Sequence, residues 1–289
     1  MLESTNNNGT PSVSPAAAAY IAVTVNPSWR HELNVSGILY CLPADGPHGF
    51  MPPEYSFLAR CVSRGVDILV SACALILTLP LMLLIALIVT LDSPGKIIFV
   101  QRRLARSRLM TGDELLTSDM FTIVQGEVNP AGRYWAPRTF RFIKFRTMYA
   151  DARERFPRLY DYTMTEEEIS RFRFKVENDP RVTKAGKWLR ELTVDELPNF
   201  WNVLTGDMRL AGPRPETPEM LSNYSPDQMT KFTVQPGVSG LAQINGRGRL
   251  LFRTTVAFDQ EYVKNMSLLL DIKIILKTIQ KVIYRHGAF

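Results

Sequence analysis

Two adjacent carboxylates, Asp195 and Glu196, are the residues of this sequence best suited to chemistry on a phosphate group. Arg190 lies five residues before Asp195, and Arg214 follows in a loop with a proline on each side of it. Guanidinium groups match phosphate oxygens, and a carboxylate held beside a bound phosphate can attack phosphorus. A structural reading is also open, because Thr193 and Glu196 fit a capping box in which Glu196 only caps a helix.

Further cations come from a segment over residues 140–148, which alternates apolar and basic side chains and predicts a strand. It presents Arg141, Lys144 and Arg146. These side chains could line a site for an anionic substrate, although a solvated strand face is the ordinary interpretation.

Glycines recur in the loop over residues 235–247. Gly237, Gly240 and Gly246 can bring backbone N–H donors close to a ligand. Their spacing matches neither a Walker loop nor a dinucleotide fingerprint, so alone they indicate a tight loop.

The elements that must position these residues follow from local patterns. A second strand is expected over 97–100, before the strand over 140–148. Helices are expected over 184–192 and, around the two carboxylates, from 193–196 to 204. The region over 151–174 is charged and reads as helical, with an interruption at Pro157.

The most apolar stretch is Ile68 to Leu91, a run of 24 residues without a formal charge. As a helix it would reach about 36 Å, enough to cross the hydrocarbon core of a bilayer. A buried helix of a soluble protein is the alternative, but the run lacks a polar stripe. Pro80 at its middle predicts a kink or a break.

Basic residues flank this run on both sides, at Arg60 and Arg64 before it and at Lys96, Arg102, Arg103, Arg106 and Arg108 after it. Positive charge tends to stay on the cytoplasmic side of a membrane. A single span violates that tendency at one end, whereas a re-entrant segment satisfies it at both. We therefore expect a re-entrant helix-break-helix anchor over residues 56–95, with a kinked spanning helix as the alternative.

The other segments complete the domain organisation. Residues 1–55 are expected to be an irregular, partly disordered lead-in, because prolines interrupt their short apolar pieces. A cytoplasmic catalytic domain is expected over 96–265, with an insertion over about 106–138. Residues 266–289 predict an amphipathic helix that either lies on a membrane or packs on the domain.

Composition limits the classes of partner. The chain has 289 residues, of which 34 are basic and 28 acidic, and its net charge of +6 suits an anionic membrane or a phosphorylated substrate. No spacing typical of nucleic-acid binding occurs, so no nucleic-acid partner is expected. Three cysteines without paired spacing argue against a disulfide framework or a zinc site. No cleavable signal peptide is evident at the start.

Together these stretches resemble the bacterial sugar transferases, the monotopic polyprenyl-phosphate sugar-1-phosphate transferases, from about residue 60 to residue 289. The family's order is kept by Asp92-Ser93-Pro94-Gly95, Lys144-Phe145-Arg146-Thr147-Met148, Asp179-Pro180-Arg181-Val182-Thr183, Asp195-Glu196-Leu197-Pro198, Trp201-Asn202-Val203-Leu204, Gly212-Pro213-Arg214-Pro215 and the loop from Pro236 to Arg247. Each motif is weak alone, but this many in one order is specific.

The resemblance implies a mixed α/β fold, mostly helical, in a monotopic membrane protein with interfacial amphipathic helices. It implies a phosphoglycosyl transferase that moves a sugar-1-phosphate from a UDP-sugar to polyprenyl (undecaprenyl) phosphate and releases UMP. The implied intermediate is a covalent aspartyl phospho-sugar, and the implied cofactor is magnesium. The implied location is the bacterial inner membrane, with the catalytic domain on the cytoplasmic face, at the first membrane step of surface polysaccharide or glycoconjugate biosynthesis.

The resemblance also implies roles for single residues. Asp195 would be the nucleophile and a magnesium contact, with Glu196 as its partner. Pro80 would break the membrane helix. Phosphate would be bound by Arg190, Arg214, Lys144 and Arg146, and the substrate or nucleotide by the loop residues Gly237, Gly240, Gln243, Asn245 and Arg247.

This sequence departs from the family pattern at Leu79, where the family often has serine, and at Ala105, where it usually has glycine. The insertion over about 106–138 leaves the sugar open, and the lack of a long multi-spanning region before residue 56 predicts a compact form. A homodimer stays open as well. Two rival functions remain, a glycosyltransferase that moves the sugar without its phosphate and a membrane-anchored scaffold.

Overall fold

The apolar run forms one continuous helix, α1 (Phe57–Asp92), in a computed structural model that describes residues 20–33, 35, 37–46, 49–174, 176, 178–246 and 249–283. Ser56 caps its first turn by accepting a hydrogen bond from the backbone N–H of Ala59. Only 11% of its most apolar 18-residue window is buried, which excludes the buried core helix of a soluble protein. Among the described residues α1 is the one helix long and apolar enough to cross a membrane.

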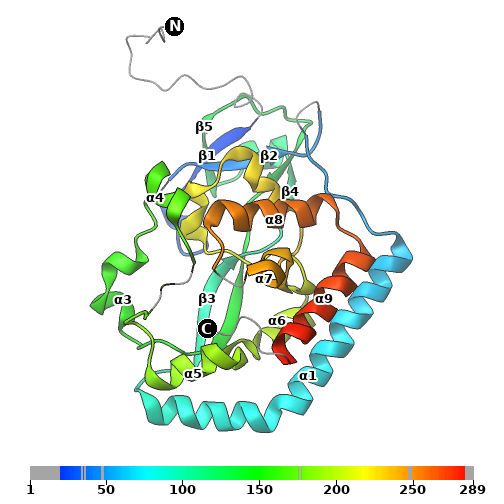
Figure 1. The fold of residues 1–289 in the computed structure, drawn as a ribbon. Helices are drawn as coiled ribbons and strands as arrows, with labels where there is room; N and C mark the ends of the chain where they lie inside the picture. The colour runs from blue at the N-terminus through cyan, green and yellow to red at the C-terminus, as the bar shows by residue number, and fades with distance from the viewer. Residues whose placement is uncertain are drawn as a thin grey trace, which may run out of the picture.

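Figure 1 shows that α1 is bent, with one arm descending beside the C-terminal helix and the other running along the foot of the molecule. Pro80 is the proline inside this helix. Proline removes one backbone donor and crowds the preceding turn, which is the usual cause of such a bend. The Thr78 hydroxyl adds to this effect by donating to the carbonyl of Ala74 at 2.7 Å.

The body above α1 contains two pairs of strands and several helices. Strand β3 (Ile98–Leu104) pairs antiparallel with β7 (Thr139–Phe145), and β8 (Arg209–Ala211) pairs parallel with β9 (Gly237–Ser239). The helices are α5 (Lys184–Leu192), α6 (Asn199–Thr205), α7 (Leu241–Gly246), α8 (Phe252–Lys264) and α9 (Leu268–Ile283), with the 3-10 turn η4 (Val194–Glu196) between α5 and α6. The helix expected over 184–192 is confirmed to the residue.

A five-stranded sheet stands at the opposite end from the foot (Figure 1), in the order β4 (Arg108–Thr111), β6 (Arg133–Ala136), β2 (Leu39–Pro43), β1 (Ile21–Val25), β5 (Phe121–Gln125). Here the structure differs from the irregular lead-in that we expected. The two lead-in strands bury Ile21, Val23 and Leu39 against the strands of the insertion. Lead-in and insertion thus form one sheet, in which α2 (Gly112–Leu116) directly follows β4 and η2 (Pro27–Trp29) follows β1.

The largest hydrophobic core joins this sheet to the C-terminal half. It includes Val23 and Leu33 from the lead-in, Met220 from η5 (Pro218–Asn223), Phe232 from η6 (Pro226–Thr233) and Phe252 from α8. The small helices α3 (Ala152–Arg155), η3 (Pro157–Tyr160) and α4 (Glu166–Arg171) line one side of the body. The added sheet is therefore packed into the body through a shared core.

A buried ionic cluster fixes the first arm of α1 to the body. Arg209 of β8 donates to Asp271 of α9 at 2.7 Å and to Asp67 of α1 at 3.4 Å, and it also contacts Ser63. Asp67 accepts the backbone N–H of Leu210 at 3.1 Å. Because a buried charge is stable only when it is paired, this cluster ties three elements to one position.

The last helix, α9, has apolar residues on two faces. Ile274 is fully buried against the body, whereas Leu269, Ile272, Leu276 and Ile279 are exposed. Figure 1 shows α9 alongside the first arm of α1. The alternative in which this helix packs on the domain is therefore confirmed for one face, and contact of the other, exposed apolar face with a membrane stays a prediction.

Candidate active site

The two adjacent carboxylates lie where α5 turns into η4. Thr193 ends α5 in a left-handed conformation, with φ of 60° and ψ of 18°. Its side chain makes no cap hydrogen bond to η4, so the capping box that the sequence allowed is not formed. Asp195 is buried, with 5% of its surface exposed, and Glu196 is half-buried.

The carboxylates have different partners. Arg214 donates to the two oxygens of Glu196 at 2.5 and 3.4 Å. Within the described part of the chain, Asp195 forms no hydrogen bond or ion pair. Burial, reinforced by the neighbouring Glu196, raises the pKa of Asp195. Burial opposes ionisation of Glu196 as well, but the charge and hydrogen bonds of Arg214 outweigh it and lower the pKa of Glu196.

Three cations from three elements surround Asp195: Lys144 of β7, Arg190 of α5 and Arg214 of the 212–215 loop, and each favours its ionised form. The Arg190 guanidinium donates through Nε to Thr147 Oγ1 at 2.9 Å. The Lys144 ammonium lies 5.7 Å from the centre of the Phe99 ring. Burial lowers the pKa of Lys144 to about 8. The structure thus brings together five of the residues that the sequence singled out, in a setting able to neutralise a phosphate group.

Arg146 lies elsewhere, although it is only two residues from Lys144. Its guanidinium is buried beneath the end of α1, where it donates to Ser93 Oγ at 2.5 Å and to the carbonyl oxygens of Ser93 at 2.6 Å, Lys96 at 2.8 Å and Val89 at 3.2 Å. The Val89 carbonyl belongs to the last turn of α1, which leaves its carbonyls without intrahelical partners, and the Ser93 and Lys96 carbonyls lie just after the helix end. In this arrangement Arg146 holds the second arm of α1 to β7 rather than facing the carboxylates.

The glycine loop supports the segment that carries Arg214. A Cβ on Gly237 would come within 2.1 Å of the Gly212 nitrogen, and a Cβ on Gly240 within 2.3 Å of the Gly212 oxygen. These glycines therefore permit two backbones to touch. Asn245 donates to the Leu241 carbonyl of its own helix at 2.8 Å.

Gln243 and Arg247, the other two loop residues expected to bind substrate, do not support the Arg214 segment in this way. Both polar atoms of the Gln243 amide are buried, and neither has a hydrogen-bond partner in the described residues. Such orphaned atoms are typical of a site that a ligand or water completes. Arg247 lies outside the described residues.

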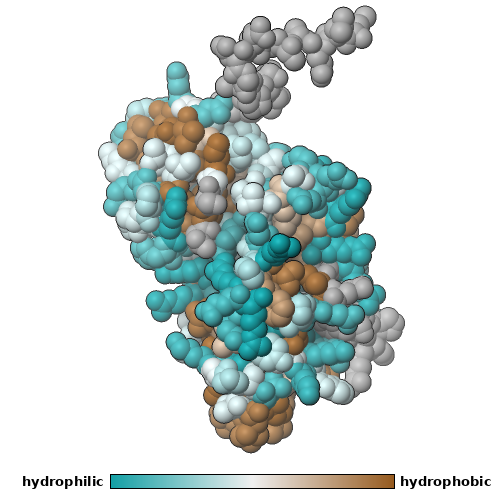
Figure 2. Space-filling view, turned by 90° about the vertical axis from the view of Figure 1, so that its left-hand side faces the viewer, coloured by the Kyte–Doolittle hydropathy of each residue, from teal (hydrophilic) through white to brown (hydrophobic). Residues whose placement is uncertain are grey.

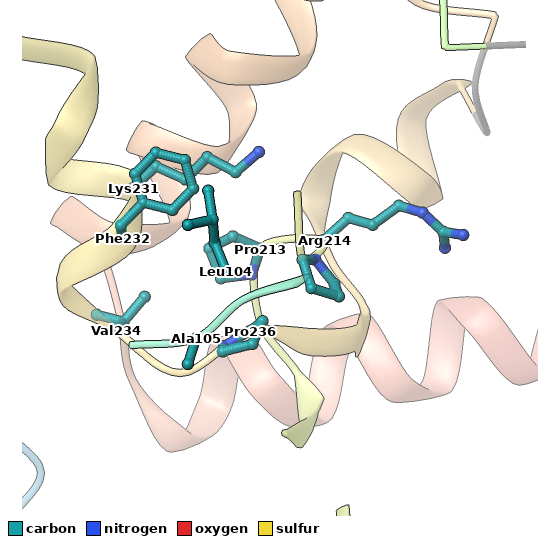
Figure 3. A pocket seen from close by; sticks show the side chains of 9 residues that line it. Leu104, Ala105, Pro213, Arg214, Lys231, Phe232, Val234 and Pro236 are labelled. Atoms are coloured by element: carbon teal, nitrogen blue, oxygen red, sulfur yellow. The ribbon is translucent and has the colours of Figure 1, made fainter. Parts of the chain in front are cut away.

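Figure 3 shows a small hollow behind the Arg214 loop, between Leu104, Pro213 and Phe232. Its volume is about 10 Å³, room for no more than about one water molecule. The Arg214 side chain points away from it (Figure 3). We regard it as a packing gap behind the loop rather than a place for substrate.

Sequence reasoning missed two residues near this cluster. Arg103 of β3 donates to the Pro215 carbonyl at 3.2 Å and lies 3.8 Å from Glu216, and its charge lowers the pKa of Glu196. Asn199 is 1% exposed, and its Oδ1 has no partner among the described residues. In the sequence Arg103 is only a charge that flanks the apolar run, because the long separation from Arg214 along the chain hides their proximity in the fold.

No group of three His, Cys, Asp or Glu side chains that could hold a metal ion occurs within the described residues. Magnesium needs no such cage, because it is commonly held by one or two carboxylates together with substrate phosphates. Asp195 fits that mode, since its carboxylate has no protein partner in the described structure.

Comparisons with known proteins cover most of the chain. The family model described as "Bacterial sugar transferase" matches residues 58–111 and 131–285, leaving out the lead-in and residues 112–130 of the insertion. The chain is 35% identical over 237 residues to the undecaprenyl-phosphate glucose phosphotransferase of Komagataeibacter xylinus, a match over 78% of this chain and 36% of that protein. It is 34% identical over 235 residues to the undecaprenyl-phosphate galactose phosphotransferase of Salmonella typhimurium, over 80% and 42%.

A shorter relative is matched over almost its whole length. The chain is 32% identical over 244 residues to the exopolysaccharide production protein ExoY of Rhizobium meliloti, a match over 83% of this chain and 95% of that protein. By contrast, the chain matches less than half of the length of each of the two phosphotransferases.

Proposed function

Since the chain belongs to the bacterial sugar transferase family, we propose that it transfers a sugar-1-phosphate from a UDP-sugar to polyprenyl phosphate and releases UMP. The observation that carries this proposal is the contrast between the two carboxylates: Asp195 is buried and unpaired among three cations, whereas Glu196 is bound by Arg214. Relatives named as undecaprenyl-phosphate sugar phosphotransferases support the same reaction class.

In the proposed mechanism Asp195 is the nucleophile. One of its carboxylate oxygens forms a bond to the phosphorus that carries the sugar, and the bond from that phosphorus to the UMP oxygen breaks. An oxygen of polyprenyl phosphate then attacks the same phosphorus and releases the carboxylate. The products are polyprenyl-diphosphate sugar and UMP.

Lys144, Arg190 and Arg214 are the proposed phosphate contacts, because all three already act on Asp195. We leave Arg146 out of this set, since its guanidinium is engaged by the end of α1. Glu196 would hold Arg214 in place and keep a second negative charge next to the nucleophile. Magnesium, held by Asp195 and the substrate phosphates, would neutralise charge on the phosphates when bound.

The anchor is proposed to be re-entrant, on the cytoplasmic face of the bacterial inner membrane. Strands β1 and β2 precede α1 in the chain, and they pair with β5 and β6, which follow it. A spanning helix would put these partners on opposite sides of the membrane, whereas a bent helix that returns to its entry face keeps them together. The bend of α1 (Figure 1) and the exposed apolar stripe of α9 agree with this arrangement.

Intact-protein mass spectrometry tests the proposed function. Purified protein is incubated with magnesium and one UDP-sugar at a time, without lipid acceptor, beside Asp195→Asn. A mass gain of one sugar-phosphate in the wild type, absent from Asp195→Asn and lost when undecaprenyl phosphate is added, is the expected result. Normal turnover with lipid but no adduct with any donor would exclude Asp195 as the nucleophile, and UDP as the product would identify transfer of the sugar alone.

A further inference from the structure

A hollow of about 210 Å³ lies between the lead-in, α3 and η5, and we propose that it takes the sugar ring of the donor, with Arg30 of the lead-in as a specificity-determining contact. This inference rests on the proposed function. The hollow is lined by Arg30 and Val35 of the lead-in, Arg153 of α3, the segment 160–163, and Glu219 and Ser222 of η5.

The size of the hollow suits a small polar ligand. On the scale in which the volumes of the two hollows are given, a cavity needs about 10–15 Å³ to hold one water molecule. The hollow behind the Arg214 loop barely reaches that value, whereas this one exceeds it many times over. Of these two hollows, only the one beside the lead-in has room for a monosaccharide.

Its wall lies close to the proposed phosphate contacts. The Tyr160 hydroxyl donates to Met148 Sδ at 3.8 Å, and the neighbouring Thr147 accepts the Nε hydrogen bond of Arg190 at 2.9 Å. The Arg181 guanidinium lies 4.8 Å from the centre of the Tyr160 ring. Tyr160 is also among the groups whose charge acts on Arg190, and Arg103 is among those that act on Tyr162. The wall of the hollow is thus within electrostatic range of the proposed phosphate contacts, and we place the sugar of a donor bound by Arg190 in the hollow.

The chemistry of the wall favours a polyhydroxylated ring over a nucleobase. The Tyr160 ring is already engaged by two guanidinium groups, those of Arg153 at 5.3 Å and Arg181 at 4.8 Å. The Tyr162 ring packs against the main core. Both rings are therefore already engaged, and because the Tyr160 hydroxyl donates to Met148 Sδ, the hydroxyl of Tyr162 is the one left to meet a sugar. Figure 2 views the side of the molecule that carries α3 in Figure 1, and hydrophilic residues cover its middle.

The lead-in wall is held firmly in place. Glu32 accepts two hydrogen bonds from Arg102 of β3, at 2.7 and 2.6 Å, and its carbonyl accepts the Thr139 hydroxyl of β7 at 3.1 Å. Gly37 approaches η5 so closely that a Cβ there would lie 3.2 Å from the Ser222 Cβ. The wall is thus positioned by the same two strands that lead to Lys144.

Arg30 itself is free to meet a ligand. It is exposed, and within the described residues its guanidinium forms no hydrogen bond or ion pair. The family match begins at residue 58, so Arg30 and Val35 belong to a part of the chain that the shared family region does not contain. The selectivity that they confer would therefore be particular to proteins with such a lead-in.

The test compares Arg30→Gln, at the end of η2, with Arg108→Gln, which removes the same charge from an exposed arginine of β4 and lies outside the hollow. The kcat and KM are measured with UDP-glucose, UDP-galactose, UDP-N-acetylglucosamine and UDP-glucuronate, together with the KM for undecaprenyl phosphate and inhibition by UDP. Because a hydrogen bond to a charged group is lost, Arg30→Gln should raise the KM of the preferred donor about tenfold. The lipid KM and the UDP inhibition constant should not change, and the donors should become more alike in kcat/KM.

Tyr162→Phe is the second variant, since it removes one hydroxyl from the wall and keeps the ring in the core. It should raise donor KM in the same direction. Donor KM and kcat/KM values for Arg30→Gln that equal those of Arg108→Gln would overturn the inference. An equal loss of kcat/KM for every donor, together with weaker inhibition by UDP, would overturn it as well, because that pattern places Arg30 on the nucleotide. Absence of turnover and adduct in the wild type would instead refute the proposed function.

Discussion

Arg146 of the β7 segment and Ser93 at the end of α1 are joined by two hydrogen bonds, from Nη1 to the Ser93 hydroxyl at 2.5 Å and from Nη2 to the Ser93 carbonyl at 2.6 Å. They belong to two motifs that are 53 residues apart and that look unrelated in the sequence. In the structure the motifs form one joint, which fixes the second arm of the membrane helix to the strand that presents Lys144. The same guanidinium therefore holds the second arm of α1 to the strand that carries Lys144, one of the proposed phosphate contacts.

Arg146→Lys should loosen this joint. A lysine ammonium cannot reproduce the fork that reaches Ser93, Lys96 and Val89 together. We expect a loss of about 1–3 kcal/mol of unfolding free energy, seen as a lower melting temperature in detergent. Arg141→Lys, at an exposed position of the same strand, is the control and should change little. Equal melting temperatures of the two variants would show that the hydrogen bonds of Arg146 do not contribute to the stability of the fold.

Glu196→Gln should separate the two carboxylates by function. The change removes the ion pair with Arg214 but leaves Asp195 intact. The covalent adduct should still form, while kcat falls by about 10- to 100-fold because Arg214 is no longer held. Single-turnover mass spectrometry beside steady-state assays measures both quantities. An adduct with Asp195→Asn but none with Glu196→Gln would reverse the two roles.

The lowered pKa of Lys144 predicts that activity falls at alkaline pH. Burial lowers its pKa from the ordinary 10.5 to about 8, so its positive charge is lost as the pH rises through about 8. Because phosphate binding needs that charge, kcat/KM for the donor should fall above this pH, and kcat/KM reports the free enzyme. Lys144→Arg stays charged and should extend the plateau to higher pH. The same alkaline fall in this variant would assign the titration to another group.

Arg209→Met should destabilise the protein through the charges that it leaves behind. Asp67 and Asp271 would lose their shared cation while still buried in the cluster. Removing one partner of a buried pair typically costs about 3–5 kcal/mol. Lys273→Met, at an exposed site of α9, is the matched control. Thermal unfolding in detergent compares the two, and a small loss in both would mean that water relieves the buried carboxylates.

The re-entrant anchor can be tested with cysteines on its two flanks. Glu54→Cys and Lys96→Cys lie at exposed positions before and after α1, in a background with Cys61 and Cys73 changed to serine. Cys41 is buried in the core and can stay. Both new thiols should react with a membrane-impermeant maleimide in inverted vesicles and neither in right-side-out vesicles. Labelling from opposite sides would establish a spanning helix.

Local patterns in the sequence were enough to predict several of the residues that the structure brings together at the candidate site. Asp195, Glu196 and Arg190 lie within one short stretch, and the helix over 184–192 follows from its own residues. The role of Arg146 could not be predicted, because nothing in its strand reveals that the end of α1 lies above it. The lead-in sheet was missed for a similar reason. Its strands are short and separated by prolines, and their partners lie beyond the membrane helix, so their pairing depends on contacts distant in sequence.

The sheet that joins the lead-in to the insertion also sets an order of events during synthesis. β2 ends at Pro43, but β5 begins only at Phe121, so the first two strands leave the ribosome long before their outer partners exist. At about 5–20 residues per second, several seconds pass in between, and α1 emerges during that interval. Entry of the helix into the bilayer can therefore precede closure of the sheet. The completed sheet would then hold the two ends of α1 near each other, since its hydrogen bonds join the chain before the helix to the chain after it.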